Sequence, residues 1–183
     1  MRKWLDLLYR VSGGLAAASL VGITALVAIQ VLFNVIDYVA IRLFGVSFGL
    51  LIPSYAALAG YALAFATFLS LGLGLRRAVH IRVTLLESQL PKPLRRITLF
   101  FVALLGVVMG GIFVYSLAII TYQSYIWGDQ GTGMLSVPLW IPQLVMCIGL
   151  VVFWIAAIDT FIDVCRTGKS PALREIDPTE DAL

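Results

Sequence analysis

Histidine and cysteine are nearly absent from this sequence, which has one histidine and two cysteines in 183 residues. A lone His80 excludes a haem held between two histidines of this chain, and also a zinc or copper site of several histidines. Cys147 and Cys165 give no disulfide framework. We interpret Cys147 as a packing residue and Cys165 as an incidental thiol.

Charge is also scarce, at 13% of residues, whereas 61% are hydrophobic and the mean hydropathy is +0.99. Soluble domains are near half apolar and a quarter charged. The sequence therefore departs from the soluble norm in the direction that a lipid environment demands.

Sequence motifs of catalysis are missing as well. The chain has no Gly-x-Ser-x-Gly, no Walker Gly-Lys-Ser/Thr and no glycine-rich dinucleotide loop. We therefore predict that it is not an enzyme. We assign it no catalytic residue, no substrate-binding residue, no metal ligand and no cofactor of its own.

Four long runs without charge dominate what is present. They are 26 to 33 residues long and end at Asp37, Arg76, Asp129 and Asp159. A spanning helix needs about 20 apolar residues, whereas strands of a membrane barrel have about 10 and alternate in polarity. The first run is too long for a cleaved signal sequence. We predict an all-α, integral membrane four-helix bundle, with spans over residues 11–34, 53–75, 97–122 and 139–163.

The distribution of basic residues predicts the topology. Twelve of the thirteen lysines and arginines fall in the N-terminus, the segment between the second and third spans, and the C-terminal tail, and only Arg42 falls on the other side. Basic residues accumulate in cytoplasmic loops. We expect both termini inside, with one transmembrane domain over residues 1–165 and a polar cytoplasmic tail over 166–183. Positive charge spread over three membrane-flanking segments does not favour nucleic acid.

Polar side chains within the spans are few. Gln30, Asn34 and Asp37 share one helical face near the outer end of the first span. Hydrogen bonding between helices plus an interfacial aspartate is favoured there over a polar binding site. Asp159 and Asp163 could bind a cation, but pairing with arginines of the basic segment, or solvation, is favoured.

The basic segment after the second span predicts contact with lipid. Such strips bind anionic headgroups at about 1 kcal/mol per basic residue. The residues expected at the inner headgroup layer are Arg76, Arg77, His80 and Arg82.

Small residues repeat every four positions in three spans, a spacing that lets helix backbones approach closely, within the bundle or against a partner. The steps are Gly14–Ala18–Gly22, Ala56–Gly60–Ala64 and Gly106–Gly110. An outer strip of aromatic and polar residues could also contact a partner chain, although an interfacial tryptophan commonly anchors in lipid. The residues predicted to contact a partner are Trp127, Trp140, Pro142, Gln143, Gly106 and Gly110.

Two motifs resemble those of one family. Residues 77–83, Arg-Ala-Val-His-Ile-Arg-Val, resemble the Arg-x-x-His-Ile-Arg-Val signature of the small membrane (Q-type) subunit of TRAP transporters (tripartite ATP-independent periplasmic transporters). Residues 138–143, Pro-Leu-Trp-Ile-Pro-Gln, followed by Gly149, resemble its Pro-x-Trp-h-Pro-Gln segment, where h is apolar. Departures are Ala78, Thr84 and Cys147, and the missing acid near the start of the second span, so no role is carried over for the carboxylates of that region.

The resemblance implies a bacterial inner-membrane subunit that braces a large membrane subunit. That large subunit would carry the sodium and substrate sites, and a periplasmic binding protein would deliver an organic acid. Two alternatives stay open. A membrane anchor of a redox complex is disfavoured by the single histidine, and a small homo-oligomeric transporter or channel by the lack of a polar pore.

Overall fold

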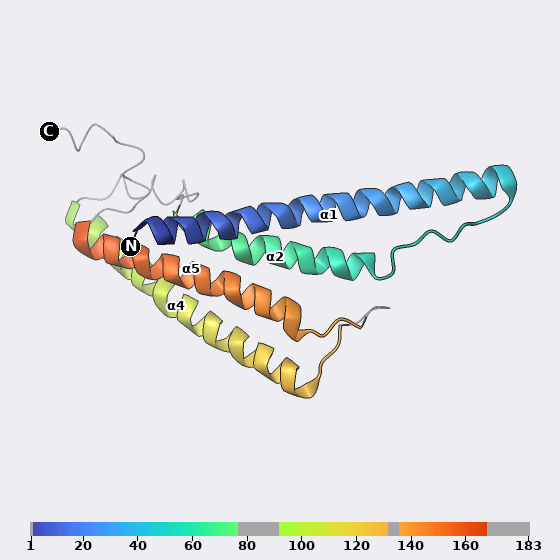
Figure 1. Ribbon diagram of the computed structural model, residues 1–183. Coiled ribbons are helices and arrows are strands. Elements are labelled where there is room, and N and C mark those ends of the chain that lie inside the picture. Colours follow the sequence, from blue (N-terminus) through green and yellow to red (C-terminus); the bar gives the residue numbers. More distant parts are fainter. Residues whose placement is uncertain (1, 77–91, 132–135, 168–183) are drawn as a thin grey trace.

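The computed structural model describes residues 2–76, 92–131 and 136–167. These residues form four α-helices, and Figure 1 shows them close together at the end that holds the N-terminus, with the pair α1 and α2 spreading away from the pair α4 and α5 toward the other end. The helices are α1 (Arg2–Phe44), α2 (Tyr55–Arg76), α4 (Lys92–Trp127) and α5 (Trp140–Thr167). Within the described ranges the only β pairing is an isolated bridge between Gln130 and Pro138. The all-α prediction is confirmed.

Each helix is long and apolar enough to cross a membrane. Their exposed surface is largely apolar, as lipid requires. The predicted spans 11–34 and 97–122 lie inside α1 and α4. The span 139–163 begins one residue before α5, and the span 53–75 begins two residues before α2 and ends one residue short of its end. The helices are continuous, and α1 and α4 extend well past the predicted spans.

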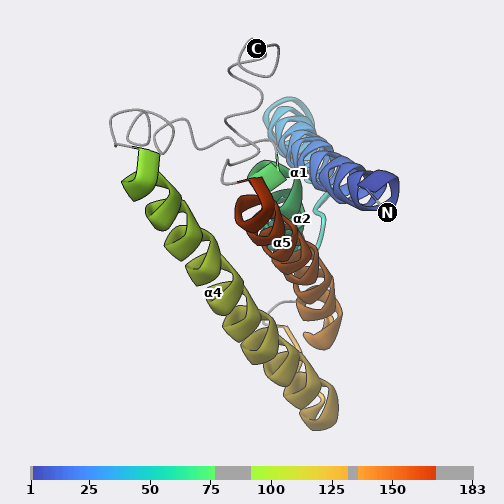
Figure 2. The same cartoon turned by 90° about the vertical axis from the view of Figure 1, so that its left-hand side faces the viewer.

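The helices form an open bundle rather than a closed square. α1 packs on α2, α2 packs on α5, and α5 packs on α4, while α1 touches α5 only slightly. Figure 2 shows α4 set apart from α1 and α2, with α5 between them. The chain therefore leaves a wide apolar perimeter open.

Glycine and proline mark the helix ends. Gly45 and Gly128 directly follow α1 and α4 with φ of 67° each, the left-handed conformation that terminates helices. The amide of Gly45 donates to the Ile41 carbonyl at 3.1 Å and closes the last turn of α1. Pro53 and Pro138 precede α2 and α5, where a proline starts a helix without breaking it.

A glycine contact sets the closest approach of two helices. A Cβ built on Gly149 of α5 would lie 2.7 Å from both the carbonyl carbon and the carbonyl oxygen of Phe68 in α2. A Cβ on Gly72 of α2 would lie 2.8 Å from Cγ1 of Val152 in α5. Only hydrogen fits at these two positions, so the backbones of α2 and α5 approach as closely as small residues allow.

The buried core lies near one end of the bundle. Tyr9, Val152 and Ala156 pack together there from α1 and α5, flanked by apolar residues of α1 and α2. This end, where α1 begins and α2 and α5 end, also carries Arg76 and Arg166. We call it the basic end. The other end is called the opposite end.

Candidate functional site

An ion-pair cluster joins α2 to α5 at the basic end. Nη1 of Arg76 donates to Oδ2 of Asp163 at 3.3 Å, and Nη2 lies 3.1 Å from Oδ2 of Asp159. The three side chains are only 15–18% exposed. The guanidinium also lies 5.9 Å from the ring centroid of Tyr9 in α1. The predicted pairing of the two aspartates with an arginine is confirmed, and it ties three helices together.

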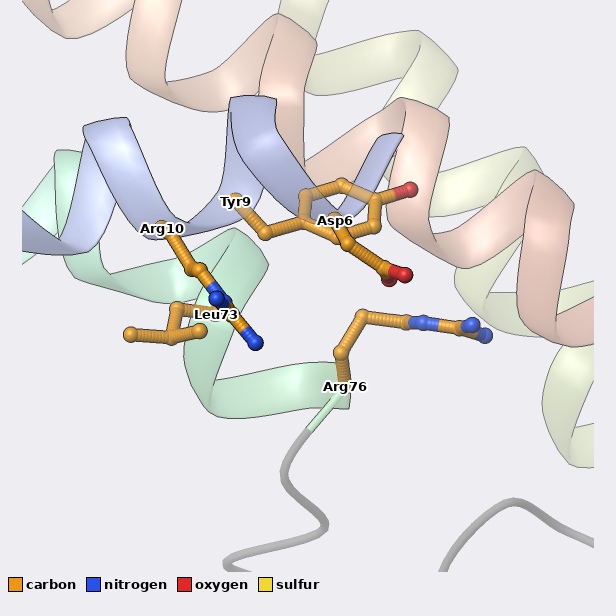
Figure 3. A pocket seen from close by; sticks show the side chains of 5 residues that line it. All are labelled: Asp6, Tyr9, Arg10, Leu73 and Arg76. Carbon is orange, nitrogen blue, oxygen red and sulfur yellow. The ribbon is translucent and has the colours of Figure 1, made fainter. Parts of the chain in front are cut away.

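A mixed-charge cavity of about 320 Å³ opens beside this cluster. Asp6, Tyr9 and Arg10 line it from α1, and Leu73 and Arg76 line it from α2 (Figure 3). Figure 3 shows the Tyr9 ring and the Arg76 side chain extending in the same direction, away from Arg10. With one carboxylate between two guanidinium groups, the cavity has no strong preference for an anion.

The basic segment predicted to contact headgroups is described only at its first residue. Arg76 lies at the end of α2, and its guanidinium is engaged by the aspartates of α5. The other three residues, Arg77, His80 and Arg82, lie outside the described residues. Lipid contact by this segment stays a prediction.

The polar face of α1 holds the chain's own loop. Nε2 of Gln30 donates to Oδ1 of Asn34 at 3.1 Å, while Oε1 of Gln30 accepts the amide of Ile52 at 2.9 Å. Asp37 accepts from the Phe48 amide at 2.8 Å and from the Gly49 amide at 3.2 Å. The prediction of hydrogen bonds between helices is therefore wrong, because these side chains bind each other within α1 or bind groups of the loop that follows α1.

The predicted outer strip divides into exposed and packed residues. Trp127 is 72% exposed, whereas Pro142 is buried in the first turn of α5. Trp140 stacks edge to face on Tyr125 with ring centroids 5.7 Å apart, so it joins α5 to α4. Oε1 of Gln143 is buried and has no hydrogen-bond partner in the described part of the chain. Contact of these residues with a partner stays a prediction.

Gly110 is used inside the chain. A Cβ built on it would lie 3.0 Å from Cδ1 of Trp154, and Nε1 of Trp154 donates to the Val107 carbonyl at 3.0 Å. Gly106, one turn earlier, faces open space instead. In the contact between α4 and α5, the Trp154 side chain therefore packs against Gly110. The four-residue spacing of glycines alone does not indicate this pairing.

Other small-residue steps face away from the chain. Cβ atoms built on Gly14, Gly22 and Gly60 would meet nothing within 4 Å. Gly13, by contrast, sits against Leu73 of α2. The glycines of these two steps therefore do not pack within the bundle, and the internal contact of α1 with α2 uses the neighbouring Gly13 instead. Contact of these steps with a partner stays untested.

The described residues offer little chemistry beyond packing and ion pairing. No group of three or more histidine, cysteine, aspartate or glutamate side chains that could hold a metal is found among them. The buried polar groups of α1, α2 and α5 serve mainly to hold these helices and one loop in place. Geometry of this kind suits a structural element of an assembly.

Comparison with known proteins gives the family. Residues 39–167 match the family model described as "Tripartite ATP-independent periplasmic transporters, DctQ component". The matched range begins near the end of α1 and includes α2, α4 and α5. No curated protein and no solved structure matches the chain. Because the match covers well over half of the sequence, this multi-pass membrane protein belongs to the DctQ component family of TRAP transporters.

Proposed function

We propose that the chain is the small permease subunit of a sodium-coupled TRAP transporter in a bacterial inner membrane. It braces the large membrane subunit, which binds sodium and an organic acid that a periplasmic binding protein delivers. Family membership supports its place as one component of such a transporter. The bracing role, sodium as the coupling ion and an organic acid as the substrate go beyond family membership and are part of the proposal.

One observation carries the bracing role. The four helices are continuous and apolar, and the ion pairs of Arg76 and the hydrogen bonds of Gln30 and Asp37 are made within the chain itself. Transporters that bind ions and anionic substrates commonly place broken helices at the membrane midplane, where helix ends and free carbonyls act as ligands. A chain of unbroken helices offers packing surface in place of such ligands. It is therefore suited to hold a partner still.

Uptake into proteoliposomes tests this role. We expect sodium-driven uptake when the large subunit, the binding protein and this chain are all present, and loss of uptake when this chain is left out. Because the proposed defect is one of assembly, the large subunit alone should show reduced thermal stability in the same lipid. Full uptake without this chain would contradict the proposal.

The orientation is proposed from the charge distribution. Both termini and the basic end would face the cytoplasm, with Arg76, Arg77, His80 and Arg82 at the inner phospholipid headgroups. A cysteine-free variant with Gly128→Cys should be labelled in intact cells by an impermeant thiol reagent, because Gly128 follows α4 at the opposite end. A Ser88→Cys variant should be labelled only after the membrane is opened. Labelling of Ser88→Cys in intact cells would contradict the proposed orientation.

A further inference from the structure

α1 is about twice as long as the helix beside it. At about 1.5 Å per residue, its 43 residues extend about 64 Å, and the 22 residues of α2 extend about 33 Å. The two helices are paired from the basic end, where Ser12 donates to the Leu69 carbonyl. Gln30 of α1 already reaches Ile52, just before α2 begins. Residues 31–44 therefore extend beyond the start of α2, on the side away from the basic end, as Figure 1 shows.

This extension and the loop that follows it, residues 31–54, form one structure that we call the distal arm. The loop returns along α1 and is fastened to Asp37, which accepts hydrogen bonds from Ser47 Oγ and from the amides of Phe48 and Gly49. Ala40, one turn after Asp37, is only 4% exposed. The arm is thus a defined surface with one side closed by its own loop.

The remaining surface of the distal arm is apolar. Its only charged residues are Asp37 and Arg42. Water does not favour a contiguous apolar surface of this kind, which marks a site of interaction. Nine exposed large apolar residues lie on the helix and four on the loop: Val31, Leu32, Val35, Ile36, Tyr38, Val39, Ile41, Leu43, Phe44, Val46, Phe48, Leu50 and Leu51.

Burial in the hydrocarbon core of the membrane does not explain the apolar surface of the distal arm either. A tilt that fitted all of α1 into a hydrocarbon core of about 30 Å would leave α2 crossing only about half of that core. The loop is also not helical, so its backbone lacks the regular hydrogen bonds of a helix, and only single amides such as those of Phe48, Gly49 and Ile52 donate to side chains of α1. Such backbone is tolerated at membrane depth only when it is covered by protein or faces a water-filled cavity.

We infer that the distal arm binds the large membrane subunit of the transporter, on the side of the membrane at which α1 ends. This inference rests on the proposed function. A soluble binding protein must dock and leave in every cycle, and transient interfaces are less hydrophobic than permanent ones. A surface with two charges in 24 residues fits a permanent partner. The large subunit is that partner, and the arm extends its contact beyond the lipid core.

Photo-crosslinking of the assembled complex tests the assignment, with two tyrosines as a matched pair. Tyr38 on the arm is 70% exposed and Tyr122 near the end of α4 is 65% exposed. A photoreactive amino acid at position 38 should crosslink to the large subunit, and the same group at position 122 should not. If the complex forms but position 38 crosslinks only to lipid, to a second copy or to the binding protein, the assignment is wrong. Equal crosslinking from both positions also contradicts it.

A charge on the arm gives the second measurement. Tyr38→Glu should weaken co-purification of the large subunit about tenfold, as expected for a residue central to an interface, and Tyr122→Glu should change it by less than about twofold. Gel filtration of each variant alone must match the unchanged chain, so that misfolding is distinguished from lost binding. A folded Tyr38→Glu chain that retains the large subunit in full overturns the inference. If the chain without substitutions does not co-purify with the large subunit, the proposed function itself is overturned.

Discussion

Replacing Arg76 by methionine is expected to lower the free energy of unfolding by about 3 kcal/mol. Arg76 is the partner of Asp159 and of Asp163, at 3.1 and 3.3 Å, and all three side chains are mostly buried. Removal of the guanidinium leaves two mostly buried carboxylates without their cationic partner. Removing one partner of a buried ion pair destabilises a protein more than replacing both partners by neutral groups. Thermal unfolding of the purified chain in mild detergent measures the loss.

A matched pair of variants separates this effect from a general loss of charge. Arg166→Met removes an arginine from the same end of the bundle. Because Arg166 is exposed, the free energy of unfolding of this variant should change little. Adding Asp159→Asn to Arg76→Met should recover at least part of the stability, because the buried carboxylate is then neutral. An Arg76→Met chain as stable as the Arg166→Met chain would show that the cluster does not hold the three helices together.

Gly149→Ala is expected to destabilise the bundle by about 2–3 kcal/mol. The new Cβ would lie 2.7 Å from the carbonyl carbon and oxygen of Phe68 and 2.9 Å from the Leu69 nitrogen. These are backbone atoms of α2, so the overlap can be relieved only if the two helices separate along their contact. The measurement is again thermal unfolding in detergent.

Gly60→Ala is the control for this helix pair. Gly60 lies in α2, and a Cβ there would meet nothing within 4 Å. Alanine has the higher helix propensity, so this variant should be unchanged or slightly more stable. If Gly149→Ala proved as stable as Gly60→Ala, the close approach of α2 and α5 at Phe68 would be disproved.

The spans were predictable from the sequence because lipid imposes a one-dimensional rule. Charge is excluded over the thickness of the hydrocarbon core, so the runs ending at Asp37, Arg76, Asp129 and Asp159 mark where helices cross. The same rule does not give helix ends. α1 continues through Arg10 at one end and through Asp37 and Arg42 at the other, because a charge leaves the lipid without breaking the helix.

Contacts between helices were harder to predict, because spacing does not identify which face is used. The aspartates of α5 are four residues apart, and the sequence predicted either solvation or pairing with arginines of the basic segment, of which the structure shows pairing with Arg76. For the small residues, Gly14 and Gly13 adjoin in sequence, yet only Gly13 packs against α2. A glycine spacing cannot distinguish these faces, since neighbouring residues of a helix point about 100° apart. The partners of Asp37 lie in a loop without regular periodicity, so no pattern indicated them.

The central claim is that this chain holds the transporter together and contributes no ion or substrate site. The most direct test is the sodium dependence of uptake in proteoliposomes containing all three components. Alanine replaces, one at a time, the polar residues that could otherwise be ligands: Gln30, Asn34, Asp37, Asp159 and Asp163. Assembly and maximal rate should fall in some variants, while the sodium concentration for half-maximal uptake and the choice of substrate stay unchanged. A shifted sodium affinity in any fully assembled variant would contradict the claim.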